Sequence, residues 1–435
     1  MAAPDIERSY SWSNPGEIFE IREIEKFQWV AQEETQQEEG TESPIATRPG
    51  TSRVVTYKMD LAFEWVCKFM RAYFGSNHRP VKLSEAKCNL DGGVGLPYKY
   101  SVDYIYKSDF VERHPNFQDG IDFDDITPFS YMWDCFPKVE ILDSSKAKDK
   151  TRIICGAPVE HFLVGAMLHS SLNEAMTKGG LASKCAMGIR TGYRGWDELY
   201  RFLPDLCENS DATRFDKSIS PKLLKYVYMV RERLMVMDGD QRRMFWWYFQ
   251  NLVFRRSYLS NGSVYDVFGG NGSGQYNTST DNTIAHILCL AYGHVCIGNT
   301  YRDFAMCKQV VYGDDYIGEA QPPDFWKFFC DTGIKIKKTP VMYKDSCDFL
   351  SSNFSHTPFG IANCPKTDKG LFSSFTSESK KWLSFRPQKL YSLWLTYYFS
   401  EHRKVFEDIM DDLGILYNRF DAYDFHFGWM VDLKT

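Results

Sequence analysis

The chain has 435 residues, of which 43% are hydrophobic, so it is long enough for two or three subdomains with sizeable cores. Its net charge of −6 argues against a uniformly basic nucleic-acid-binding surface, and its twelve cysteines include no CxxC pair, which favours reduced thiols over a zinc ribbon. No apolar run is long enough to span a bilayer and no signal peptide or other targeting signal is evident, so we expect a soluble intracellular protein.

The negative charge is concentrated at the N-terminus. Residues 1–50 hold 11 acidic and 4 basic residues, whereas the remainder holds 46 acidic and 47 basic residues and is close to neutral. Residues 32–53 are rich in Glu, Gln, Ser, Thr and Pro, which is typical of a flexible linker. We therefore expect an N-terminal extension over residues 1–55, and a main body whose charge is compatible with a nucleic-acid partner.

Two aspartates lie at the end of a predicted strand, in the segment DATRFD at 211–216. Asp211 and Asp216 are five positions apart, and on a regular strand an odd spacing sends side chains to opposite faces. Both can reach one site only if the strand ends between them. A helix start soon afterwards supports such an ending, because Ser220 is a typical N-cap and Pro221 suits the first helical turn. A surface strand end without a site is the alternative interpretation.

A glycine-rich loop runs into a helix over residues 269–284, GGNGSGQYNTSTDNTI. Apolar residues at helical spacing follow the loop: Ile284, Ile287, Leu288 and Ala291. Thr278 and Asn282 are four positions apart, so they share one face of that helix. The glycines do not form a GxGxxG dinucleotide-binding turn. The loop either approaches a nucleotide or another backbone closely, or it is a simple flexible hairpin.

The segment VVYGDDYIG at 310–318 predicts a hairpin with two carboxylates at its tip. The apolar residues on either side read as strands, and Gly313 permits a tight turn between them. The adjacent charges of Asp314 and Asp315 repel each other unless a cation lies between them. Mg²⁺ prefers carboxylate oxygens, so a magnesium site is one interpretation and an ordinary Asp-rich turn is the other.

Taken in order, these segments give D-x4-D, then SG-x3-T-x3-N, then YGDD. The series resembles the central motifs of viral RNA-dependent RNA polymerases of the picornavirus-like supergroup, and is most similar to those of astroviruses and potyviruses. The resemblance implies an α+β fold shaped as a right hand, with fingers, a palm built on a ferredoxin-like antiparallel sheet with helices, and a helical thumb. It implies fingers over 56–205 with an insertion at about 235–270, a palm over 206–355 and a thumb over 356–435, whose aromatic-rich sequence has a helical pattern.

Flanking segments extend the resemblance over about residues 83–355. GGVGLPY at 92–98 resembles the template-entry motif, with Gly-Gly in place of the usual Thr-Ser. KVEILDSSKAKDKTRII at 138–154 resembles the basic finger over the incoming triphosphate. GIKIKKTP at 333–340 lies where the family carries a lysine near the leaving pyrophosphate, and CDFLSSNF at 347–354 resembles the primer-grip hairpin without its usual basic pair.

The resemblance implies a role for each candidate site residue in RNA-directed RNA synthesis from nucleoside triphosphates. Two Mg²⁺ ions, or Mn²⁺ as a substitute, are expected to be held by Asp211 and Asp314 with support from Asp315. The remaining candidates divide between the triphosphate (Lys150 and Arg152), the ribose (Asp216, Ser273, Thr278 and Asn282) and protonation of pyrophosphate (Lys337 or its neighbour Lys338).

The same resemblance implies the partners and the setting. We expect an RNA template and primer, nucleoside triphosphates, a viral protein primer and other replicase proteins, at membrane-associated replication complexes in the host cytoplasm. Two alternative functions stay open at this point: a reverse transcriptase, because YGDD also fits its YxDD pattern, and a polymerase-like RNA-binding protein without catalytic activity.

Overall fold

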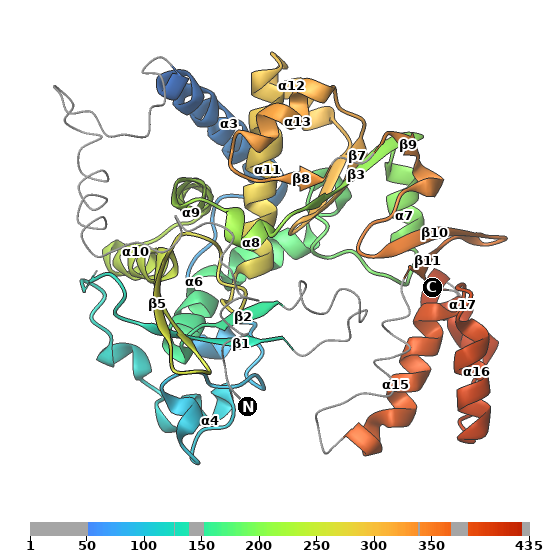
Figure 1. Cartoon of the computed structure of the whole chain (residues 1–435), viewed down its shortest axis with the longest axis horizontal. Coiled ribbons are helices and arrows are strands. Elements are labelled where there is room, and N and C mark those ends of the chain that lie inside the picture. The colour runs from blue at the N-terminus through green and yellow to red at the C-terminus, as the bar shows by residue number, and fades with distance from the viewer. Residues whose placement is uncertain (1–50, 126, 139–151, 338–339, 367–381, 429–435) are drawn as a thin grey trace.

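The computed structural model describes residues 51–125, 127–138, 152–337, 340–366 and 382–428 of the chain (Figure 1). The described part mixes helices with largely antiparallel sheets, as the α+β expectation requires. The expected linker over 32–53 and the lysines of the basic finger lie almost wholly outside it, although helix α3 (Thr51–Phe74) already begins at Thr51. None of the helices in the described ranges is both long and apolar enough to cross a membrane.

A four-stranded sheet, in the order β2-β1-β4-β5, forms one region at the lower left of Figure 1. Its strands come from two distant parts of the chain: β1 (Met132–Pro137), β2 (Ile153–Gly156), β4 (Phe254–Leu259) and β5 (Val264–Phe268). β1 and β4 pair in parallel, and the other pairs are antiparallel. Nearby helices are α4 (Lys107–Arg113), α6 (Val159–Lys178), α9 (Pro221–Leu234) and α10 (Gly239–Val253). Residues 254–268 therefore belong to the same sheet as residues 132–156.

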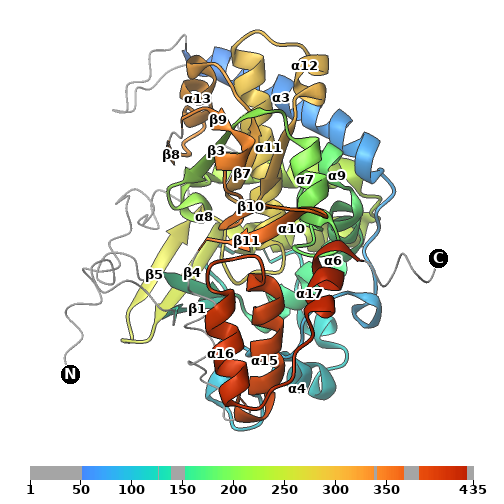
Figure 2. The ribbon, with the colours of Figure 1, turned by 90° about the vertical axis from the view of Figure 1, so that its right-hand side faces the viewer.

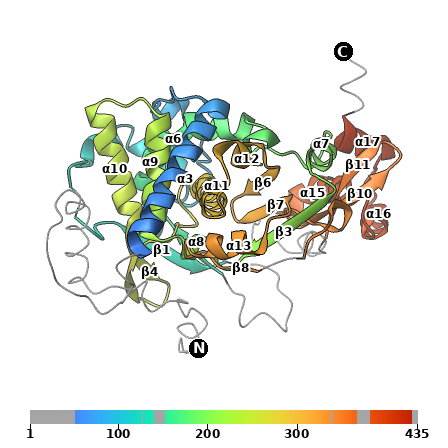
Figure 3. The same ribbon diagram turned by 90° about the horizontal axis from the view of Figure 1, so that it is seen from above.

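A second sheet, in the order β6-β7-β3-β8, occupies the centre of the molecule, and all its pairings are antiparallel. Its strands are β3 (Leu206–Ala212), β6 (Gln309–Tyr312), β7 (Asp315–Glu319) and β8 (Ile336–Lys337), with β9 (Met342–Tyr343) also paired to β3. Helix α11 (Thr278–Cys296) packs against β6 and also contacts α3, α9 and α13 (Pro323–Cys330). Figure 3 shows α11 end on, between α3 and the strands.

The sequence explains these central helices. Ser220 caps α9 by accepting a hydrogen bond from the Leu223 amide (3.2 Å), and Pro221 occupies the first turn, as predicted. The apolar residues predicted for α11 are fully buried, and its neighbours on every side are buried too, so the helix runs through the core and not along the surface. α12 (Tyr301–Met306) follows and leads into β6.

The C-terminal region stands apart at the lower right of Figure 1 and faces the viewer in Figure 2. The hairpin of β10 (Ser352–Thr357) and β11 (Gly360–Pro365) contacts α7 (Gly195–Phe202) on one side and the C-terminal helices on the other. These helices are α15 (Trp382–Tyr397), α16 (Arg403–Asp412) and α17 (Arg419–Phe427), and they share an aromatic core around Trp394 and Phe406. The helical pattern predicted for this region is confirmed, while β10 runs across the boundary expected at 355/356.

The twelve cysteines all lie within the described ranges, and all are free thiols. Seven of them are buried, and the expectation that these thiols are reduced in the protein stays a prediction.

Candidate active site

Strand pairing brings the three predicted metal-ligand positions to the same end of the central sheet. Tyr312 is paired with Asp315, so Gly313 and Asp314 form the turn between β6 and β7. On β3, Ser210 is opposite Tyr316, and one further step along this antiparallel register brings Asp211 level with Asp315. The side chain of Asp211 lies outside the described part, so its place is known from its backbone alone.

Helix α11 holds the turn between β6 and β7 from inside the molecule. Gly313 has a φ of +62°, a conformation that suits glycine. Its N–H donates to the hydroxyl of Thr283 (2.9 Å), and its carbonyl oxygen accepts from Nδ1 of His286 (3.1 Å). Burial lowers the pKa of His286 to about 4, so this imidazole is neutral at physiological pH. These two side chains therefore hold the backbone of the turn that carries Asp314, and the sequence motifs did not point to Thr283 or His286.

The predicted break between Asp211 and Asp216 is present. β3 ends at Ala212, Arg214 adopts a left-handed conformation, and the short helix α8 (Phe215–Ser218) carries Asp216. The amide nitrogen of Asn282 donates a hydrogen bond to the Asp216 carboxylate. Asp216 and Asn282, two of the ribose candidates, are therefore hydrogen-bonded to each other.

Neighbouring charges act on Asp216 in opposite directions. Burial raises the pKa of this carboxyl above its usual value, and the charge of Asp314 raises it further. The Asn282 hydrogen bond and the positive charges of Lys217 and Arg152 lower the pKa of Asp216. Asp216 thus lies within electrostatic reach of both Asp314 and Arg152, which links the ribose, metal and triphosphate candidates in one region.

Ser273 and Thr278 make local contacts in the glycine-rich loop. The Ser273 hydroxyl accepts a hydrogen bond from the Cys155 amide on β2 (3.0 Å), and Thr278 Oγ1 lies 2.7 Å from the carbonyl oxygen of Gly272. A Cβ on Gly274 would lie 2.6 Å from the Cys155 carbonyl oxygen, so only glycine permits this approach. Both hydroxyls therefore brace the loop against β2 and α11, and their expected contact with the ribose stays a prediction.

The basic candidates are described only in part. Lys150 and Lys338 lie outside the described residues. Arg152 is exposed at the start of β2, where its carbonyl oxygen accepts from the Lys138 amide (2.8 Å). Lys337 is exposed on β8, directly opposite Asp211 in the β3–β8 register. The strand order therefore puts Lys337 beside the carboxylate positions.

The donor set suits a hard divalent cation. The positions brought together at the sheet end are carboxylates, with no thiolate or imidazole among the candidates, and Mg²⁺ and Mn²⁺ prefer oxygen ligands. Within the described residues there is no group of three or more histidine, cysteine or acidic side chains placed to share a metal ion. The Asp211 side chain is not part of that description, so the fit rests on its backbone position and on Asp314 and Asp315.

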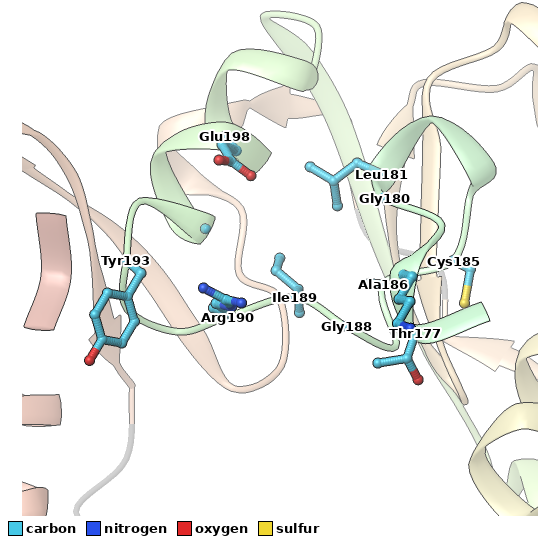
Figure 4. A pocket seen from close by; sticks show the side chains of 12 residues that line it. Thr177, Gly180, Leu181, Cys185, Ala186, Gly188, Ile189, Arg190, Tyr193 and Glu198 are labelled. Carbon is cyan, nitrogen blue, oxygen red and sulfur yellow. The ribbon is translucent and has the colours of Figure 1, made fainter. Parts of the chain in front are cut away.

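A separate hollow of about 230 Å³ lies between the end of α6 and the start of α7 (Figure 4). Lys178, Arg190, Tyr193 and Glu198 are among its lining residues, and none of the candidate site residues lines it. The segment beside it is joined to the C-terminal helix, because the Tyr193 amide donates to the carbonyl oxygen of Phe425 (2.6 Å). The segment that lines one side of this hollow therefore contacts α17.

The sequence model for viral RNA-dependent RNA polymerases matches residues 118–412. The chain belongs to this family. Among curated relatives, the genome polyprotein of Bean common mosaic necrosis virus (strain NL-3) is 29% identical over 252 residues, which make up 55% of this chain and 8% of that polyprotein. The genome polyprotein of Sweet potato mild mottle virus (isolate Salazar) is 28% identical over 249 residues, or 55% of this chain and 7% of that polyprotein. The chain thus spans less than a tenth of each of these two polyproteins.

The fold of this polymerase is also found among solved structures. The Sicinivirus 3Dpol RNA dependent RNA polymerase matches it with a TM-score of 0.64 and 18% identity, over 80% of this chain and 79% of that chain. The right-hand α+β fold and the picornavirus-like resemblance are therefore confirmed, and neither alternative function is supported. Members of the family use divalent metal ions and act on RNA and nucleoside triphosphates.

Proposed function

We propose that this chain replicates and transcribes the genome of a positive-strand RNA virus by adding nucleotides to an RNA 3′ end on an RNA template. The observation that supports the proposal is that the end of β3 meets the turn between β6 and β7: the register carries Asp211 opposite Asp315, and Asp314 lies in the turn itself. The Asp216–Asn282 pair adjoins this cluster, since the charge of Asp314 acts on Asp216.

The cation proposed for the carboxylates is Mg²⁺, as two ions, with Mn²⁺ able to replace it. Asp211 and Asp314 would be the main ligands and Asp315 would support them. When bound, such ions would favour ionisation of the RNA 3′-hydroxyl and offset the negative charge of the leaving pyrophosphate.

The chain's own residues would orient the nucleotide. Arg152, with Lys150, would hold the triphosphate, because guanidinium and ammonium groups bind phosphate strongly. Lys337, next to Asp211 across the sheet, would protonate the pyrophosphate as it leaves. Asp216 would accept a hydrogen bond from the ribose 2′-hydroxyl and Asn282 would donate one to it, with Ser273 and Thr278 bracing the loop beside them.

We assign the subdomains according to the right-hand fold. Residues 56–205 with the insertion at about 235–270 would form the fingers, because strands from both segments share the β2-β1-β4-β5 sheet. Residues 206–355 would form the palm and 356–435 the thumb, with residues 1–55 as an N-terminal extension. A protein primer, further replicase proteins and a membrane-associated replication complex in the host cytoplasm would complete the setting.

Primer extension tests this function. Purified protein would be given a homopolymer RNA template, a complementary RNA primer, the matching nucleoside triphosphate and Mg²⁺. We expect extension that stops when a chelator is added and resumes when Mg²⁺ is restored. Absence of extension with both Mg²⁺ and Mn²⁺ would contradict the proposal, and extension on RNA that prefers deoxyribonucleotides would reassign the chain to reverse transcription.

A further inference from the structure

A continuous set of polar side chains is buried behind the glycine-rich loop. Asn271, Gln275, Asp281 and Asn282 are each at most 5% exposed, and Arg231 is fully buried. Arg231 lies on α9, Asp281 and Asn282 lie on α11, and Asn271 and Gln275 lie in the glycine-rich loop that precedes α11. Buried polar groups are costly unless they are hydrogen-bonded, so the bonds among them decide how each side chain is oriented.

The network begins at a buried ion pair. Arg231 Nε donates to Asp281 Oδ1 (2.7 Å), and the other two guanidinium nitrogens donate to Asn173 (3.0 Å) and Thr280 (2.8 Å). The second oxygen of Asp281 accepts from the Tyr228 hydroxyl (3.2 Å) and from Gln275 Nε2 (2.8 Å). With so many donors around it, Asp281 is held as a fixed acceptor for Gln275.

Each amide fixes the direction of the next one. The side-chain oxygen Oε1 of Gln275 accepts from the backbone N–H of Asn277 (2.9 Å), so Gln275 Nε2 faces Asp281 and also donates to Asn271 Oδ1 (2.7 Å). Asn271 Nδ2 then donates to the backbone carbonyl oxygen of Thr278 (3.0 Å) and to Oδ1 of Asn282 (2.8 Å). A backbone N–H can only donate and a backbone carbonyl can only accept. The side-chain amides of Gln275 and Asn271 therefore cannot be flipped without losing their bonds to Asn277 and Thr278.

This series of hydrogen bonds ends at Asn282, one of the ribose candidates. Since the Asn282 oxygen is occupied by Asn271, the Asn282 nitrogen faces Asp216 and donates to it. An amide nitrogen has two hydrogens and a carboxylate has two oxygens, so the joined pair can still offer one donor and one acceptor to a sugar hydroxyl. The reversed amide would instead turn an oxygen toward the Asp216 carboxylate and could not donate.

We propose that Asn271 and Gln275 are positioning residues for sugar selection, which orient the Asn282 amide through the chain that starts at the Arg231–Asp281 pair. This inference rests on the proposed function, because it assigns the Asp216–Asn282 pair to the ribose. Neither positioning residue contacts the nucleotide. Both act by fixing which end of the Asn282 side chain faces Asp216.

Single-nucleotide extension with a ribonucleoside triphosphate and with its 2′-deoxy analogue tests the proposal. Asn271→Leu keeps the side-chain shape but removes the donor to Asn282, so kcat/KM for the ribonucleotide should fall about tenfold more than for the deoxyribonucleotide, the loss expected for one strong hydrogen bond. Gln275→Met is one step further along the chain and should lower the discrimination in the same direction by a smaller factor.

Tyr228→Phe is the matched control. It removes a hydrogen bond to the same Asp281 oxygen but leaves the path from Asp281 through Gln275 and Asn271 unbroken, so the sugar discrimination should equal that of the wild type. Thermal unfolding of each variant would be measured beside the kinetics. If Asn271→Leu does not fold, Gln275→Met alone still decides the direction of the effect.

The outcomes separate two kinds of failure. Equal losses with both sugars in Asn271→Leu and Gln275→Met would overturn the positioning role and leave these residues as structural. A wild type that extends RNA but does not discriminate between the sugars would also overturn it. A wild type that extends no RNA at all would instead overturn the proposed function.

Discussion

The two parts of the candidate site are held in different ways. Asp314 is placed by the backbone, through strand register and the bonds that Gly313 makes with Thr283 and His286. Asn282 is oriented by other side chains, through Asn271 and the residues behind it. A change at the sheet end should therefore impair reaction with any sugar, whereas a change behind the loop should alter which sugar is chosen.

Asp314→Ala should have the largest effect. It removes a proposed metal ligand, so incorporation should fall at least about a thousandfold, and equally for both sugars. The fold should be kept, because the lost charge lies among like charges and its removal relieves repulsion. Steady-state extension assays and thermal unfolding measure both effects.

Asp324→Ala is the control for this charge change, since Asp324 is exposed on α13. It should retain wild-type activity. An Asp314→Ala protein with more than a trace of incorporation would show that the carboxylate is not a ligand.

Arg152→Ala should weaken use of all nucleotides without changing the sugar preference. A charge-assisted contact to phosphate is worth about 1.5–3 kcal/mol, which corresponds to about a ten- to hundredfold loss in kcat/KM. The loss should be seen as a higher KM and a lower kcat. Arg302→Ala removes an exposed arginine on α12 and should leave the kinetics unchanged; identical kinetics for the two variants would assign Arg152 to the solvated surface.

Gly313→Ala tests whether the backbone of the turn matters in itself. At a φ of +62° an alanine is strained by about 1–2 kcal/mol, although its Cβ would have room, with the nearest atom 3.9 Å away. Gly298, at a φ of +85° after the end of α11, has nothing within 4 Å of its Cβ and should show a similar loss of stability on substitution.

Only Gly313→Ala should also lower the rate, because only this glycine precedes Asp314. Urea unfolding gives the free energies, and single-nucleotide extension gives the rates. An equal loss of rate in Gly298→Ala would mean that general destabilisation, and not the turn, controls the reaction.

Acid should weaken the fold through its buried histidines. Burial lowers the pKa of His286, His294 and His426 to about 4 and that of His161 to about 3. Between these values and about 6.5 the unfolded chain binds more protons than the folded chain, so the free energy of unfolding falls as the pH drops through this window. Urea unfolding at pH 5.0 should show a free energy at least about 1 kcal/mol lower than at pH 7.5.

This sensitivity is spread over separate parts of the fold, because His286 supports the turn at the sheet end and His426 lies in the C-terminal helix α17. His286→Phe should reduce the pH dependence, since it removes one of the groups that must be protonated on unfolding. The same free energy of unfolding at both pH values would contradict the burial of these neutral imidazoles.

The sequence was most informative where spacing alone defines the geometry. The helix cap at Ser220, the strands flanking Gly313 and the break between Asp211 and Asp216 all depend on neighbours a few positions away, so they could be predicted. The parallel pairing of β1 with β4 could not, because nothing local specifies a partner so distant along the chain.

The supporting side chains of the site were missed for the same reason. Asn271 and Gln275 lie in the glycine-rich loop, and nothing in their spacing connects them with Arg231 about 40 positions earlier. One signal was present: Asp281 lies in a helix that is mostly apolar from Ile284 onward, and a buried carboxylate needs a charged partner.

The most direct test compares Asp314→Ala and Asn282→Ala in one single-nucleotide extension assay on an RNA template, with each sugar. Asp314→Ala should lose both reactions together, so that the little activity left shows no new preference. Asn282→Ala should lose ribonucleotide addition strongly and deoxyribonucleotide addition much less, because a site built to bond the 2′-hydroxyl rejects analogues without it by as much as ~10⁴-fold. Equal losses for both sugars in Asn282→Ala would contradict the division between metal-binding carboxylates at the sheet end and an Asp216–Asn282 pair that selects the sugar.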